Sequence, residues 1–368
     1  MTTIVSGSQI TFNDNTTQNT SAYGGGFAFR NRIINGDCRI DQRNAGASVT
    51  PTTNVYTLDR WYARNTQSSK YSVQQNAGSV TPPAGFKNYL GMTSLSAYSV
   101  ASGDFFAMQH NIEGLNVADF DWGTANAKTI TLSFWVRSSL TGTFGGCLGN
   151  YDFNRSYPFT YTISSANTWE QKTITIAGDT TGTWKTDNLT GIALYLGIGV
   201  GSTYSGTVGS WTGSGLISAT GATSVVGTNG ATFYITGVQL EKGSTATSFD
   251  YRPYSAELAM CQRYCPVWET TANGDSIAVG QVYGSTTGLV DLPFPVTPRA
   301  KPSGISTTGS FVLLNSTASG LAATLTFNAS SLASMRIVGT VSSGLTTGNA
   351  TALGTSAASK IIATGCEL

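Results

Sequence analysis

The sequence predicts an all-β protein with a short N-terminal arm, an antiparallel jelly-roll sandwich, a short linking helix and a small C-terminal β domain. Charged residues make up only 11% of the 368 residues, whereas glycine contributes 43. Glycine disfavours helices, and the charged residues that favour them are scarce, so long helices are not expected. Short runs of alternating apolar and polar residues recur between clusters of Gly, Asn, Asp and Ser, which is typical of strands joined by turns.

The charge pattern excludes several classes of protein. Twenty Lys and Arg residues face 19 Asp and Glu residues, which leaves a net charge of +1 with no basic block. Phosphate-backbone binding needs clustered cations, so we expect no nucleic-acid partner. No apolar run reaches the roughly 18 residues of a membrane span, and the N-terminus lacks the pattern of a signal peptide. We therefore expect no membrane insertion.

The five cysteines are odd in number and scattered, unlike a disulfide framework. They are expected to be buried thiols of a protein that folds in a reducing cytoplasm. Cys261 and Cys265 lie four residues apart, but no histidine or further cysteine pair stands near them to complete a zinc site. We predict neither a metal site nor a cofactor.

Residues 1–28 form a polar arm that has too little apolar surface to fold alone. Within it Ile10 and Phe12 alternate with polar neighbours as in a short strand, and a run of three glycines at 24–26 supplies a flexible joint. We expect this arm to dock on another protein surface through Ile10 and Phe12.

Residues 29–253 read as the jelly roll. In residues 129–137 the apolar side chains recur at every second position, which places them on one face of a strand. Similar runs lie at 71–73, 172–176 and 231–240, with no helical segments between them. Several such strands without crossover helices predict two packed antiparallel sheets.

The period changes in the string SAELAMCQRY at 255–264, which predicts a helix within a linking segment 254–268, capped by Ser255 and stopped by Pro266. Residues 269–368 return to strand patterns at 288–292, 311–314 and 322–327 and carry very few charges. A separate β domain with so little charge would be poorly soluble, and burial between identical subunits would remedy this.

Several strings resemble the tail fibre and appendage proteins of tailed bacteriophages that contain a carbohydrate-binding-like jelly roll. They are GSQITFNDNTTQNTSA in the arm, NGDCRIDQR at 35–43, YTLDRW at 56–61, FYITGVQLEKG at 233–243, ELAMCQRY at 257–264 and LPFPV at 292–296. Cys265 and Pro298 depart from the family, which usually has an aromatic residue and a methionine there. Residues 62–230 resemble this family only in general character and contain none of the matching strings.

The resemblance implies a virion structural protein, assembled in the host cytoplasm, that forms a homotrimeric tail fibre or adhesin. Residues 1–28 would attach it to a tail or capsid protein, and its β domains would contact a host surface glycan. A capsid head fibre or decoration protein is the alternative. A polysaccharide depolymerase tailspike is less favoured, because no repeat of the kind that builds a long β-helix is visible. The lack of a signal peptide argues against a secreted carbohydrate-binding module. No enzyme activity is expected.

Glycan contact requires exposed aromatic faces surrounded by amide, hydroxyl and carboxylate groups. Candidate residues lie in three loop-like stretches: Tyr151 in 150–157, Trp184 in 183–187, and Tyr204 and Trp211 in the Gly/Ser-rich stretch 202–211. Tyr and Trp supply stiff contact area on such a backbone, although a loop tryptophan also often packs down on the sandwich. We predict these four residues as ligand-binding candidates.

The string Asp59-Arg60-Trp61 could hold a sugar by bidentate hydrogen bonds and ring stacking. We favour a structural cluster instead, in which a buried Asp–Arg pair beside a core tryptophan pins the sheet edges. His110, the only histidine, is expected to be a satisfied polar residue at a strand edge, since no nucleophile motif accompanies it. We predict no catalytic residues. Carboxylate pairs among Asp119, Asp121, Asp152 and Glu170 remain open from spacing alone.

Overall fold

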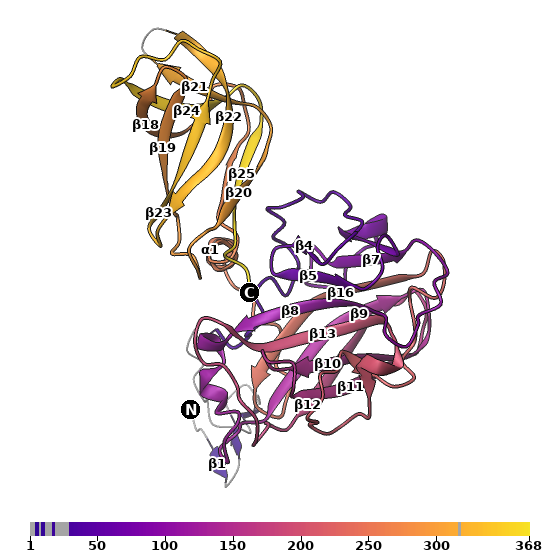
Figure 1. Cartoon of the computed structure of the whole chain (residues 1–368). Coiled ribbons are helices and arrows are strands. Elements are labelled where there is room, and N and C mark those ends of the chain that lie inside the picture. Colours follow the sequence, from indigo (N-terminus) through magenta and orange to yellow (C-terminus); the bar gives the residue numbers. More distant parts are fainter. Residues whose placement is uncertain (1–3, 7–8, 12–16, 19–28, 316–317) are drawn as a thin grey trace.

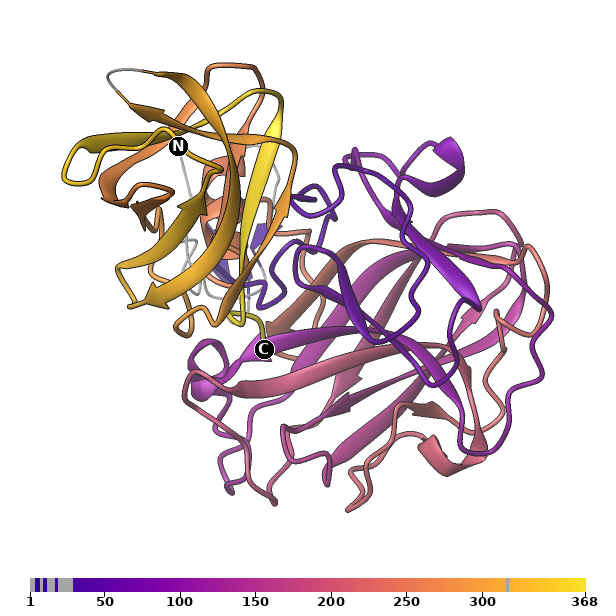
Figure 2. The same cartoon turned by 45° about the horizontal axis from the view of Figure 1, so that its top comes forward.

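The computed structural model describes residues 4–6, 9–11, 17–18, 29–315 and 318–368. It contains a two-sheet sandwich and a smaller closed barrel, with the helix α1 and the C-terminus at their junction (Figures 1 and 2). The predicted all-β class is confirmed. Among the described residues α1 (Tyr254–Gln262) is the only α-helix, beside four single-turn 3-10 segments at Ala77–Ser79, Gly114–Asn116, Ala118–Phe120 and Ser202–Tyr204.

The sandwich is a jelly-roll type pair of antiparallel sheets. One sheet has the order β11 (Ser156–Ile163), β10 (Gly142–Gly149), β13 (Thr190–Val200), β8 (Phe105–Glu113), β5 (Trp61–Asn65) and β4 (Val55–Leu58). The other has the order β12 (Glu170–Ile176), β9 (Ile130–Ser138), β16 (Thr232–Lys242), β7 (Leu90–Ser94) and β6 (Tyr71–Gln75). A short parallel pair, β14 (Ser205–Gly206) and β15 (Ser218–Ala219), lies in the connection after β13.

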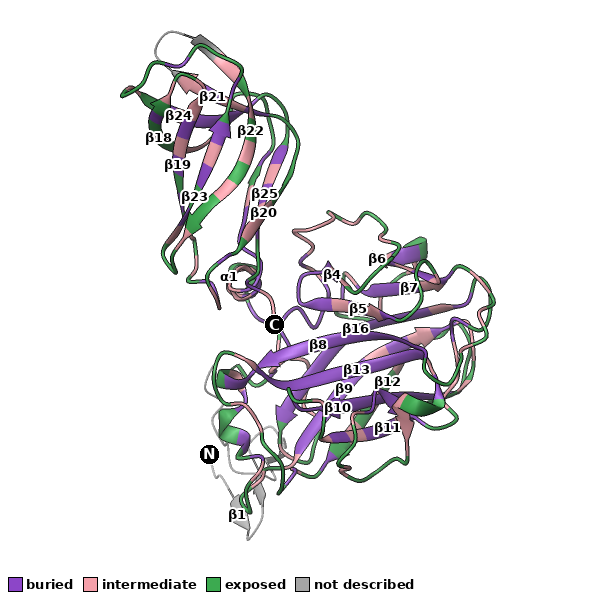
Figure 3. Cartoon of the chain, viewed as in Figure 1, coloured by how far each residue is buried: buried purple, intermediate pink, exposed green. Residues whose placement is uncertain are grey.

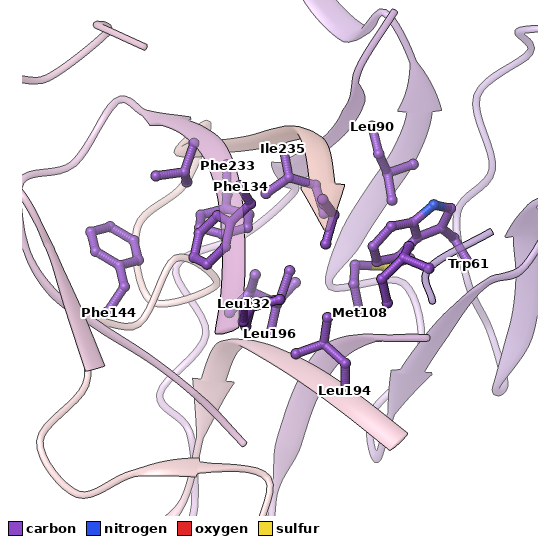
Figure 4. Packing of buried hydrophobic residues seen from close by; sticks show 14 of the residues in the cluster. Trp61, Leu90, Met108, Leu132, Phe134, Phe144, Leu194, Leu196, Phe233 and Ile235 are labelled. Carbon is purple, nitrogen blue, oxygen red and sulfur yellow. The ribbon is translucent and has the colours of Figure 1, made fainter. Parts of the chain in front are cut away.

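The alternation that predicted the sandwich strands is realised in its core. On β9 the side chains of Ile130, Leu132, Phe134 and Val136 are fully buried between the sheets. They pack with residues of the opposite sheet such as Leu196 (Figure 4). The central strands β8, β13 and β16 are buried along nearly their whole length (Figure 3), so both faces of each sheet are covered there.

The C-terminal strands close into a barrel in the order β18 (Ser276–Gly284), β19 (Thr287–Pro293), β23 (Ser334–Thr340), β22 (Ala318–Ser330), β21 (Phe311–Asn315) and β24 (Ala350–Thr355). Its interior is filled by alternate residues such as Val290, Leu313 and Ile337. A three-stranded sheet of β17 (Val267–Thr270), β25 (Ser359–Thr364) and β20 (Gly304–Thr308) lies beside it.

The helix covers less of the linking segment 254–268 than predicted. Helix α1 ends at Gln262, and Val267 already begins β17, so only the first part of 254–268 is helical. Pro266 has no N–H to donate and disfavours helical geometry in the residue before it, which explains the early end. Ser255 does not cap the helix. Pro253 occupies that position, and no side chain there accepts a hydrogen bond.

In the arm, Ile10 lies in β2 (Gln9–Thr11), which pairs with β1 (Ile4–Ser6) and β3 (Thr17–Gln18). Phe12, the second predicted docking residue, lies outside the described residues. No helix in the described part of the chain is long and apolar enough to cross a membrane.

The two bodies are joined by buried charges as well as by the chain. Glu367 accepts a hydrogen bond from Arg60 at 2.6 Å and pairs with Arg43 at 2.5 Å, while Arg60 also lies over the ring of Tyr264. Next to α1, Arg263 makes two hydrogen bonds to Glu113 on β8. The C-terminal residues after β25 thereby anchor to the sandwich.

Candidate functional site

Three tryptophan rings from different loops meet at one end of the sandwich. The ring centroid of Trp122 lies 4.7 Å from that of Trp184 and 5.1 Å from that of Trp211, and the latter two are 5.3 Å apart. All three contacts are edge to face, an arrangement that aromatic rings prefer. Tyr157 extends the group, with its ring 5.2 Å from that of Trp211.

Each of these indoles is fixed by its own N–H. The Nε1 of Trp122 donates to the carbonyl of Lys128 at 2.8 Å, and the Nε1 of Trp211 donates to that of Ala177 at 2.8 Å. The Nε1 of Trp184 donates to the backbone of its own loop at 3.2 Å. Since the N–H groups are occupied, what these rings offer a ligand is their apolar faces, in fixed orientations.

The loops that carry the rings are held by a buried ion pair. Arg155 binds both carboxylate oxygens of Asp179, at 2.7 and 2.8 Å, and Asp179 is only 2% exposed. This hydrogen-bonded pairing raises the pKa of Arg155 above its usual range. Asn150 is also buried, and its side chain binds the backbone of Arg155 and the carbonyl of Thr183. The stretches 150–155 and 179–184 are therefore fixed against each other.

Beside the rings lies a cavity of about 160 Å³, which we call the tryptophan pocket. Its walls are formed by Val117, Ala118, Asp121, Trp122, Thr124, Trp184, Lys185, Thr186, Gly191 and Ile192. An aromatic wall beside hydroxyl, carboxylate and ammonium groups can stack one face of a sugar ring and bind its hydroxyls.

The charged groups of the tryptophan pocket are only weakly paired. The Nζ of Lys185 is 3.9 Å from Asp152, and that of Lys128 is 3.8 Å from Asp121, with both carboxylates substantially exposed. Exposed ion pairs of this length contribute little to stability, so a ligand can replace them at a small cost in free energy. Lys185 also lies 5.5 Å from the ring centroid of Tyr151, which is 49% exposed at the rim.

The structure brings together three of the four residues predicted from aromatic loops. Trp184 lines the tryptophan pocket, and Tyr151 lies at its rim. Trp211 packs against Trp122 and Trp184 without lining the pocket itself. Tyr204 lies elsewhere, against Phe105 at 5.0 Å on the outer face of the six-stranded sheet. Both aromatic residues of the 202–211 stretch pack on buried clusters of the sandwich.

Trp122 is the functional candidate that sequence reasoning missed. It lies in the string Asp119-Phe-Asp-Trp-Gly123, whose carboxylates are its only functional candidates from the sequence. Gly123 has a φ of +85°, and a Cβ there would come within 2.7 Å of the carbonyl oxygen of Gly182. This close approach of the two loops is what joins Trp122 to Trp184.

The string Asp59-Arg60-Trp61 is buried throughout, but its charges do not pair with each other. Asp59 accepts hydrogen bonds from the backbone and side chain of Gln42, and burial raises its pKa to about 6. Arg60 has a φ of +71° and points instead to Glu367. The expected Asp–Arg pair is therefore wrong, because the left-handed backbone turns the two side chains to different partners.

His110 lies on β8, between β13 and β5, so the expectation of a strand edge is wrong. It is fully buried, with Nε2 2.9 Å from the carbonyl of Ile34. Burial, with help from nearby Arg60, lowers its pKa to about 3.

The four carboxylates that the sequence left open as possible catalytic pairs each lie near a cationic side chain. Asp119 binds Arg32 and Lys242, and Glu170 binds Lys172. Within the described ranges, no three His, Cys, Asp or Glu side chains are grouped as metal ligands. All five cysteines are free and buried, as predicted.

Comparison with known proteins gives likenesses only at the level of structure. No family model and no curated protein matches the chain. The enzymatically active domain of tailspike protein 4 from bacteriophage CBA120 is 12% identical with a TM-score of 0.32, over 58% of this chain and 22% of that chain. A family 11 carbohydrate-binding module from Clostridium thermocellum, in complex with a β-1,3-1,4-mixed-linked tetrasaccharide, is 10% identical with a TM-score of 0.27, over 53% of this chain and 97% of that chain. At these scores neither establishes a family for the chain.

Proposed function

We propose that this chain is a glycan-binding structural protein of a tailed-phage particle, a homotrimeric fibre without enzyme activity. The tryptophan pocket is the observation that carries this proposal. Its rings are fixed before any ligand arrives, so binding requires little ordering of side chains. The sugar would stack on the exposed part of Trp184, and its hydroxyls would bind Lys185 and Asp121 in place of their present weak partners.

The proposed site binds weakly on its own, because a pocket of this size buries little ligand surface. Three copies in one fibre would raise the avidity through effective concentration, without any new contact. The outer face of β18 supports association of identical chains. Val279 is 75% exposed and Tyr283 is 73% exposed there, and the barrel wall around them has few charges.

The glycan site is tested by the binding of fluorescently labelled protein to host cells. Trp184→Ala removes the wall of the pocket from a half-buried position, so we expect at least a tenfold loss of binding with an unchanged circular dichroism spectrum. Tyr204→Ala is the matched control, since it removes an aromatic residue from the same body away from the pocket. Equal binding by the wild type and Trp184→Ala would exclude the pocket as the site.

The particle role has separate tests. Light scattering should give three times the chain mass, and a monomer at all concentrations would contradict the trimer. Deletion of residues 1–28 should leave a folded protein that no longer enters particles, and its retention in purified virions would contradict attachment through the arm. Labelling on the capsid rather than the tail would favour the head-fibre alternative. Release of reducing ends from host polysaccharide would contradict the absence of enzyme activity.

A further inference from the structure

A second cavity, of about 420 Å³, lies outside the sandwich, where α1, β17, β18 and β19 come together. Its walls include Trp268 and Phe294, with Gln262 and Ser276 contributing polar side chains. The tryptophan pocket has no residue in common with it. In Figure 1 this region is at the end of the barrel that is nearest α1.

The aromatic wall of this cavity is held by the barrel. The ring centroids of Trp268 and Phe294 are 5.6 Å apart, with an angle of 45° between the ring planes. Trp268 is paired to Ile361 through the backbone of β17 and β25, and its ring packs on the barrel core while staying partly exposed. One part of the ring is thus anchored, and the remainder borders the cavity.

The indole N–H of Trp268 differs from those of most other tryptophans in the chain. The indole N–H groups of five other tryptophans each donate to a backbone carbonyl, namely those of Trp61, Trp122, Trp169, Trp184 and Trp211. The indole N–H of Trp268 donates no hydrogen bond to any described residue. Trp268 borders the cavity with an unused donor as well as an aromatic face.

Among the polar side chains beside the cavity, the amide of Gln262 has no hydrogen-bond partner in the described part of the chain. Its nitrogen can donate and its oxygen can accept. Glu269 directly follows Trp268 on β17, so the two side chains lie on opposite faces of the strand, and the Glu269 carboxylate pairs with Lys360 at 3.3 Å.

We propose that this cavity is a second glycan site, which binds a pyranose. The sugar stacks on Trp268, and its hydroxyls accept from the indole N–H and the Gln262 amide nitrogen and donate to the Gln262 amide oxygen. The carbonyls of a proline-rich peptide would accept from the same N–H groups, but proline has no N–H of its own, so the amide oxygen would stay unpaired. This difference favours a sugar over a proline-rich peptide.

The test uses the intact protein labelled with 5-fluorotryptophan, whose seven tryptophans give separate fluorine resonances. Trp268→Phe identifies the resonance of Trp268. The ligands are the methyl pyranosides of glucose, galactose, mannose and N-acetylglucosamine, together with a proline-rich peptide. We expect at least one sugar to shift the Trp268 resonance saturably, with an approximately tenfold larger dissociation constant in Gln262→Ala. Gln171→Ala, at an exposed position of β12 in the sandwich, is the matched control and should leave the constant unchanged.

Two outcomes would overturn the proposal. The first is a Trp268 resonance that no sugar moves, or that moves equally in wild type and Gln262→Ala. The second is a shift caused by the peptide alone, which would make the cavity a peptide site. The resonance of Trp184 reports the tryptophan pocket in the same spectra. Failure of one site is therefore distinguishable from failure of the other.

Discussion

Substitution of Trp61 by alanine should destabilise the sandwich far more than it affects any ligand. The side chain is fully buried, and it packs among Leu90 and Met108 (Figure 4) and against the edge of His110 at 5.1 Å. Truncation of a buried tryptophan costs about 3–5 kcal/mol. Its Nε1 also donates to the carbonyl of Asn35 at 3.0 Å, and loss of that bond inside the core adds about 1 kcal/mol.

The expected total of about 4–6 kcal/mol is a large part of the roughly 5–15 kcal/mol that stabilises a domain. Urea unfolding followed by circular dichroism measures it as a lower midpoint of the sandwich transition. Trp61→Phe keeps a six-membered aromatic ring but loses the N–H and part of the indole volume, so it should lose about 1–3 kcal/mol relative to the wild type, less than the alanine variant. Trp169→Ala, at a partly exposed ring in the loop before β12, is the surface control. An unchanged midpoint with lost glycan binding would refute the reasoning and make Trp61 a recognition residue.

Three further predictions concern the junction, the buried histidine and the ring cluster. Glu367→Gln leaves the 1% exposed Arg60 without a counter-ion, so thermal unfolding should show a loss of about 3 kcal/mol, against less than about 1 kcal/mol for Asp291→Asn in an exposed pair. The folded pKa of His110 is about 3, below its ordinary 6.5, so the unfolded state binds the proton first and stability falls as the pH drops below 6.5. His110→Gln should make that loss smaller in urea titrations between pH 6.5 and 4.5, and an identical slope would contradict the assignment. Trp211→Ala should lower both the melting temperature and glycan binding. Loss of only one of them would show that Trp211 either stabilises the ring cluster or contacts the ligand, but does not do both.

Sequence reasoning could find the strands in which apolar and polar residues alternate. The alternation at 129–137 corresponds to β9, and the run at 231–240 corresponds to β16. The closure of the barrel could not be predicted from the sequence, because β24 pairs with both β18 and β21, which are distant in sequence. No local pattern encodes such a pairing.

The candidate site was accessible only in part, for a related reason. Tyr and Trp in Gly/Ser-rich loops pointed to Trp184 and Trp211, which the structure joins. The third ring, Trp122, comes from a segment read for its carboxylates, and its place depends on the contact between Gly123 and Gly182. Tyr204 has the same composition around it as Trp211, but its ring packs on Phe105 and not on the other tryptophans. Composition identifies residues suited to a ligand, whereas loop packing decides which of them meet.

The central claim is that the tryptophan pocket binds a host glycan, and a crystal structure of the protein soaked with oligosaccharides from the host's surface polysaccharide tests it most directly. We predict electron density for a sugar ring against Trp184, with hydroxyls within hydrogen-bond distance of Lys185 and Asp121. A sugar bound at another part of the sandwich, with the pocket beside Trp122 and Trp184 empty, would contradict the account.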